Sequence, residues 1–408
     1  KKKGYKESES RFSTLFFEKG ILSTSDNNIV FSHTSILEFY LAEYARNNEE
    51  FYDFMIQKGN RIYFKNEICF YSGLVPDCKK LLDSMADTII EVIMKNIDIV
   101  DTLNNIEIIT DFKIEKDELV KKLEENRPTQ KEIDDINDNS WREVTPDEFS
   151  KKKSPILLET KQNSQDSENV EGEIVQREAE DFLVLLSIYG NILKNAELLD
   201  NSDKVQHLEN YMYAMNILLG EIFVLAEEIK EGAQFEEFIK KNQEKGKELT
   251  PEDFEKLQEL FLEMIKVSFP IAIQHMILEN VGTPKLEVAI DELMEYKKDK
   301  PFEKFMLEFL KCDLNIGNVM SELHRYIQKE TSEGILKLIF VKLLFYYRMR
   351  FFGTNTKIYN SILDSIIEVQ IKLNPEKSSN LTKTFKGNKS MVRKEVAKRI
   401  EKRQSIEL

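Results

Sequence analysis

The feature that most constrains this fold is a nearly continuous helical periodicity of apolar residues from residue 178 to residue 373. The 408-residue chain has 14 Gly and 9 Pro, too few turn formers for a sandwich or barrel of many short strands. We find no strict repeat period, so we expect an all-α fold with an irregular helical bundle or solenoid. The periodicity predicts helices at 178–199, 203–230, 234–243, 251–278, 286–297, 301–311, 316–329, 332–351 and 356–373.

The first part of the chain has a different pattern. Residues 5–19 predict a helix, which Gly20 would end because glycine tolerates a left-handed backbone. Short β-prone segments at 21–23 and 29–32 flank an Asx-rich turn and predict a hairpin. We expect strands nowhere else.

A second helix is predicted to follow the hairpin. Ser35 has the residue type of an N-cap, and Glu38 three residues later would complete a capping box. Helix, hairpin and helix in this order are typical of a small winged-helix-like module, which we place at residues 1–58.

Composition divides the rest of the chain. Residues 59–114 predict a helical domain broken near Gly59 and at 73–77, and residues 115–177 are charged and poor in apolar side chains. We therefore predict a linker or insertion at 115–177, a helical bundle or solenoid at 178–376 and a basic tail at 377–408.

Charge limits the partners that this chain could bind. It has 58 Lys and Arg against 73 Asp and Glu, a net charge of −15, which disfavours wrapping of nucleic acid or an anionic membrane. The basic tail is the exception, and we interpret it as a solvated segment, with nucleic acid or an acidic partner as the alternative.

Cysteine content and hydropathy bear on location. Cys69, Cys78 and Cys312 lack paired spacing and predict reduced, buried thiols in a cytoplasmic protein. No signal peptide is recognisable at the start of the sequence. The apolar stretch 335–352 contains Lys and Arg in its interior, so we expect a buried core helix and no membrane partner.

Motifs that carry catalysis or bind metals are missing from the sequence. It has no Walker phosphate loop, no Gly-x-Gly-x-x-Gly, no Gly-x-Ser-x-Gly and no His-Glu-x-x-His. The four histidines lie far apart, and the calcium-like string 135–139 has Ser140 and Pro146 where a glycine and a glutamate would be needed. We therefore predict no catalytic site, no metal and no cofactor held by this chain alone.

One histidine lies in a more informative context. A His at a strand-to-helix junction, as predicted for His33, is more often a structural residue than a ligand. The string 29–43, however, resembles the winged-helix signature of NACHT-type STAND ATPases, Phe-x-His-x-Ser-x-x-Glu-Phe/Tyr-x-Ala-Ala. The matching positions are Phe31, His33, Ser35, Glu38, Phe39 and Ala42, and Leu37 stands where the family usually has Gln. The resemblance implies that His33 contacts the β-phosphate of bound ADP and holds the resting state closed.

Two other segments are similar to STAND proteins. Residues 62–75 are similar to the helix pair after the winged helix, and 185–195 with Asp203-Lys204 are similar to a C-terminal segment of many bacterial members. A tight helix crossing at Gly190 and a polar helix end at Asn195 would explain the second segment equally well.

The resemblance implies the C-terminal regulatory and ligand-sensing region of a STAND-type ATPase switch in bacterial antiviral defence. We expect the ATPase core, and the ATP or ADP that it binds, to belong to a longer protein. The absence of an initiating Met adds to this expectation. The expected partners are a protein trigger, this core and, on activation, further copies of the protein.

The trigger contact is expected in 178–373. Its aromatic residues are either binding hot spots or core residues: Phe302, Phe305, Phe309, Phe345, Tyr346, Phe351 and Phe352. The alternative function is a non-enzymatic helical scaffold or a nucleic-acid-binding protein. A DNA-reading winged helix is disfavoured because residues 35–50 carry four Glu against Arg46 alone.

Overall fold

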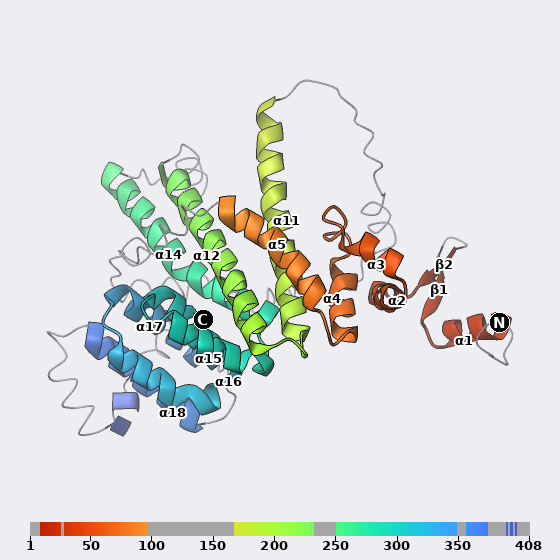
Figure 1. Cartoon of the computed structure of the whole chain (residues 1–408). Coiled ribbons are helices and arrows are strands. Elements are labelled where there is room, and N and C mark those ends of the chain that lie inside the picture. Colours follow the sequence, from red (N-terminus) through yellow and green to blue (C-terminus); the bar gives the residue numbers. More distant parts are fainter. Residues whose placement is uncertain are drawn as a thin grey trace. The chain divides into compact units, whose positions relative to one another are not determined.

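The computed structural model describes residues 9–25, 28–95, 167–231, 250–348 and 356–373, with 389–390, 392–394 and 396–397 near the C-terminus. Over these residues the fold is all-α with one two-stranded sheet, as predicted (Figure 1). The chain divides into two compact units, residues 1–81 with 128–198 and residues 82–127 with 199–408.

The first unit begins with the predicted helix and hairpin. Helix α1 spans Glu9–Glu18, and Gly20 follows it with a φ of 68°, the left-handed value that a glycine stop requires. Strands β1 (Leu22–Ser25) and β2 (Asn28–Phe31) are antiparallel, and Leu22 pairs with Phe31. The predicted hairpin is therefore confirmed.

The predicted capping box is wrong. Helix α2 (Thr34–Arg46) begins one residue before Ser35, and His33 is its N-cap with an extended backbone. Glu38 instead accepts a hydrogen bond from Asn66 Nδ2 on α4, at 2.8 Å. A tertiary hydrogen bond thus takes the carboxylate that a capping box would need.

Three more helices complete the described part of this unit: α3 (Glu49–Ile56), α4 (Lys65–Leu74) and α11 (Ser167–Asn195). Helix α4 packs against α2 and α11, and Asn195 Nδ2 donates to Ser72 Oγ over 2.9 Å. Helix α11 begins at Ser167, within the segment 115–177 for which a linker or insertion is predicted. The rest of that segment, 115–166, lies outside the described residues.

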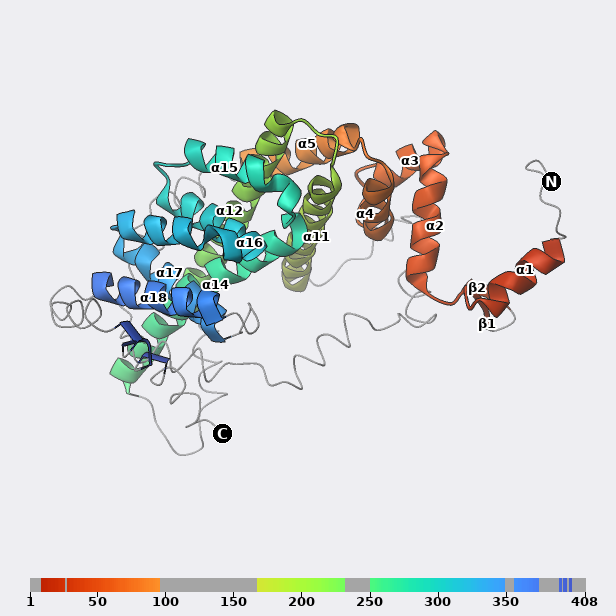
Figure 2. The same cartoon turned by 90° about the horizontal axis from the view of Figure 1, so that it is seen from below.

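The second unit contains the long helices. Helix α5 (Lys79–Lys95) belongs to it from Leu82 onward. The other elements are α12 (Asn201–Glu231), α14 (Pro251–Val281), the 3₁₀ turn η1 (Pro284–Leu286), α15 (Glu287–Tyr296), α16 (Pro301–Lys329), α17 (Glu333–Arg348) and α18 (Thr356–Leu373). Helices α17 and α18 lie side by side, and α16 contacts both (Figures 1 and 2).

Most of the predicted helices agree with these elements. The break predicted between 311 and 316 is a kink at Asn315, whose φ of −154° and ψ of 53° interrupt α16. The helix predicted at 234–243 lies outside the described residues.

The aromatic residues of α16 and α17 lie in the core. Phe302, Phe305, Phe309 and Tyr346 are each at most 5 % exposed. The rings of Phe305 and Phe309 lie 5.0 Å apart, and Phe309 approaches Tyr346 at 6.0 Å. Of the two alternatives, binding hot spot or core residue, the structure supports the core for these four side chains, because facing helices bury them. Phe345 is half-buried, and Phe351 and Phe352 lie outside the described residues.

Hydropathy singles out α14 among the described helices. Phe254–Val281 is long and apolar enough to cross a membrane by length and composition, with a mean hydropathy of 1.4. A mostly buried core helix passes the same test; α14 contacts α12, α16 and α17, and 33 % of its apolar window is buried. Most of α17 is buried, as predicted for this apolar stretch.

Candidate functional site

His33 lies on a well-supported junction between β2 and α2. The Ser32 N–H donates to Ile21 O at 2.9 Å, which ties the end of the hairpin to its beginning. The Ile36 N–H donates to His33 O at 3.1 Å and opens the helix. The His33 side chain is exposed, so an imidazole held on a fixed backbone faces the surface of this module.

The residues of the STAND-like string separate into two groups. Ala42 is fully buried, Glu38 bonds to Asn66, and the Phe39 ring meets Phe70 of α4 edge-on at 6.1 Å. These contacts hold α2 against α4. His33 and Ser35, by contrast, are exposed at the start of α2, where they could meet a ligand or another domain.

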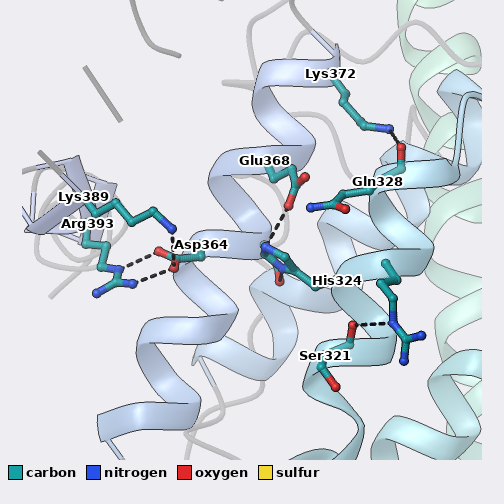
Figure 3. A network of polar contacts seen from close by, with 10 residues as sticks. Ser321, His324, Gln328, Asp364, Glu368, Lys372, Lys389 and Arg393 are labelled. Carbon is teal, nitrogen blue, oxygen red and sulfur yellow. Dashed lines mark hydrogen bonds and ion pairs between the residues drawn. The ribbon is translucent and has the colours of Figure 1, made fainter. Parts of the chain in front are cut away.

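A second polar site lies in the other unit, between α16 and α18 (Figure 3). His324 Nε2 lies 3.1 Å from Glu368 Oε2, and His324 Nδ1 lies 3.2 Å from Ser365 Oγ. One turn further along α18, Lys372 Nζ donates to the backbone oxygens of Gln328 and Glu330 at 2.6 and 2.8 Å. These contacts attach the second half of α16 to α18.

The same face of α18 also binds residues near the C-terminus. Arg393 donates from Nε and from a terminal guanidinium nitrogen to the two carboxylate oxygens of Asp364, each at 2.6 Å (Figure 3). Lys389 Nζ lies 3.9 Å from Asp364 Oδ2. Asp364, Glu368 and Lys372 recur at intervals of four residues and therefore share one face of the helix.

An open pocket of about 450 Å³ lies beside this network. It is close to the Asn315 kink, and α16 and α18 supply its walls. Its lining residues are Gly317, Met320, Ser321, His324, Arg325, Gln328, Ser361 and Asp364.

The order Ser365, His324, Glu368 repeats the hydroxyl, imidazole and carboxylate sequence of a hydrolytic triad. Ser365 is fully buried and does not line the pocket, so a substrate would have no access to its hydroxyl. These three side chains therefore link α16 to α18, and their arrangement does not support nucleophilic catalysis.

The described residues form neither a candidate metal site nor a reactive thiol site. Within the described ranges, no three His, Cys, Asp or Glu side chains are grouped to hold a metal ion. Cys78 and Cys312 are buried and Cys69 is half-buried, and all three are free thiols. Burial raises the pKa of Cys69 and of Cys78 to about 11, which keeps both thiols protonated at neutral pH.

Sequence reasoning did not single out His324, Asp364, Glu368 or Lys372. The four-residue spacing of the last three was the available signal, but it is common on solvated helix faces. Arg393 and Lys389 were predicted to belong to a solvated basic tail. That interpretation is wrong for Arg393, which is paired and partly buried against Asp364.

Comparisons with protein families, with curated proteins and with solved structures give no match to this chain.

Proposed function

We propose that this chain is the regulatory and ligand-sensing region of a STAND-type ATPase switch that acts in bacterial antiviral defence. The observation that carries the proposal is the exposed His33 side chain on the supported junction between hairpin and helix, within the STAND-like string. An imidazole N–H at this junction can donate a hydrogen bond to a negatively charged phosphate oxygen.

In this proposal the nucleotide is held mainly by a separate ATPase core. That core supplies the phosphate loop that this sequence lacks, and His33 adds one contact to the β-phosphate of ADP. The contact stabilises the closed state, because it exists only while the module lies on the core.

The helical second unit is the proposed sensor of a protein trigger. Its described surface carries exposed apolar side chains on α12 and α15: Val224, Leu225, Val288 and Tyr296 are 45 to 67 % exposed. A trigger that binds the open form more tightly would shift the population and permit assembly with further copies.

The proposal is tested with His33→Ala in a protein that contains the ATPase core. Loss of one charge-assisted hydrogen bond to phosphate is worth about 1.5–3 kcal/mol, so the open population should rise about tenfold to hundredfold. The measurements are the ADP dissociation rate and activity without trigger. His275→Ala is the matched control, because His275 is an exposed histidine on α14 in the other unit. Unchanged ADP dissociation and basal activity in the His33 variant would contradict the proposal.

A further inference from the structure

Within the second unit, the residues around Arg393 are docked on α18 by a polar contact and include one buried apolar side chain. Arg393 forms the bidentate pair with Asp364, and Lys389 lies near the same carboxylate. Val392, between them, is 5 % exposed. Asp364 itself is 13 % exposed, so the ion pair is sheltered from water on the aspartate side (Figure 3).

The sequence around this contact is strongly basic. Residues 377–408 contain ten Lys or Arg and three Glu, in a chain whose net charge is −15. Lys389 and Lys394 are exposed, whereas Arg393 is partly covered by its contact with Asp364. Such a cluster is the electrostatic footprint of a surface that neutralises phosphates.

The docked geometry competes with that role. A guanidinium that forms two parallel hydrogen bonds to a carboxylate has both of those donors occupied and cannot present them to a phosphate. The Asp364 carboxylate also repels a phosphate that approaches Lys389.

We propose that Lys389, Arg393 and Lys394 belong to a nucleic-acid-binding surface, and that Asp364 holds this surface in a docked, inhibited state on α18. Release of Arg393 from Asp364 makes the segment available to a phosphate backbone. The proposal rests on these contacts and on the basic sequence around them, and it does not depend on the function of His33.

The test compares Asp364→Asn with the unchanged full chain. Binding of a fluorescent 20-base-pair DNA duplex is followed by anisotropy at several salt concentrations between about 50 and 200 mM, where phosphate contacts weaken steeply. Asp364→Asn should bind about tenfold more tightly at the lowest salt. Its plot of log K against log salt should be steeper by about two, because Lys389 and Arg393 become available.

Glu368→Gln is the matched control. It removes the same charge from the same face of α18, one turn away, but the partner of Glu368 is His324 and not the basic segment. This variant should keep the affinity and salt slope of the unchanged chain. Lys394→Ala should lower the slope by about one, because Lys394 is exposed and does not take part in the docking.

Limited trypsin digestion measures, in the absence of nucleic acid, whether the segment around Arg393 is docked on α18. Asp364→Asn should be cut faster after Lys389, Arg393 and Lys394 than the unchanged chain or Glu368→Gln. Equal cutting rates would show that Asp364 does not hold the segment. Faster cutting without tighter DNA binding, or equal tightening by both variants, would overturn the nucleic-acid surface and its control by Asp364.

Discussion

The Lys342 ammonium of α17 lies 2.9 Å from the Asp313 carboxylate of α16, and the two side chains are only 2 % and 1 % exposed. The Tyr346 hydroxyl donates to the same carboxylate. Asp313 precedes the Asn315 kink by two residues, so this cluster attaches α17 to the point where α16 changes direction. Burial lowers the pKa of Lys342, and the charge of Asp313 opposes that shift.

Removal of one member of this pair should be costly. Lys342→Met leaves the Asp313 carboxylate buried without its cation, and we expect a loss of about 3–5 kcal/mol in the free energy of unfolding. Urea denaturation followed by circular dichroism measures this loss.

Two variants serve as comparisons for Lys342→Met. Lys337→Met on the same helix removes a pair with Glu333, which is 73 % exposed, and should cost less than about 1 kcal/mol. The double variant Lys342→Met with Asp313→Asn should recover part of the loss, because no uncompensated charge remains. Equal losses for Lys342→Met and Lys337→Met would contradict the importance of the buried pair.

Alkaline pH should destabilise the fold through Cys78. Burial raises the pKa of this thiol from 9.0 to about 11, so the folded chain keeps a proton that the unfolded chain releases. The stabilising effect is complete below pH 9 and is lost as pH rises toward 11. Relative to Cys78→Ala, the unchanged chain should lose on the order of 2 kcal/mol between pH 8 and 11. The measurement is urea denaturation at intervals of one pH unit. Parallel pH curves for the two proteins would show that this thiol is not the cause.

Gln274 is a buried polar side chain whose hydrogen-bonding groups are poorly satisfied. It is fully buried, its Oε1 has no hydrogen-bond partner among the residues that the structure describes, and its Nε2 lies 3.5 Å from Met306 O. Gln274→Met keeps the volume and removes the unsatisfied oxygen, so stability should be unchanged or rise by about 1 kcal/mol. Gln258→Met is the comparison, because Gln258 donates to Lys230 O at 2.6 Å and its loss should cost about 1 kcal/mol. Thermal unfolding of both variants measures these changes in stability. A large loss of stability in Gln274→Met would refute the prediction.

Gly282 should not tolerate a side chain. Its N–H donates to Leu278 O at the end of α14, and an added Cβ would collide with that backbone carbonyl. Gly282→Ala should therefore cost about 2 kcal/mol or more. At Gly317 the nearest atom to an added Cβ is Ile358 Cδ1, at 3.8 Å, an ordinary contact. Gly317→Ala should be neutral or stabilise by up to about 1 kcal/mol. Thermal melts that rank the two variants in the opposite order would contradict this prediction.

Local sequence patterns predicted much of the fold. The hairpin followed from two β-prone segments around an Asx-rich turn, and the stop after α1 from Gly20. The helical period located α12, α15, α17 and α18 closely, and it placed a break where Asn315 leaves the helical conformation. These features depend on residues within a few positions of one another, so their signals are present in the sequence.

The sequence by itself thus determined most of the helical segments, the position of the hairpin and which apolar faces are buried in a core. Only the tertiary structure decided the partners of individual polar groups. Glu38 bonds to Asn66 rather than to its own helix start, His324 pairs with Glu368, and Arg393 pairs with Asp364. The physical reason is that apolar periodicity predicts which face of a helix is buried, but it does not predict which other helix covers that face. A charged side chain also has many acceptable partners in a chain this rich in Asp, Glu, Lys and Arg.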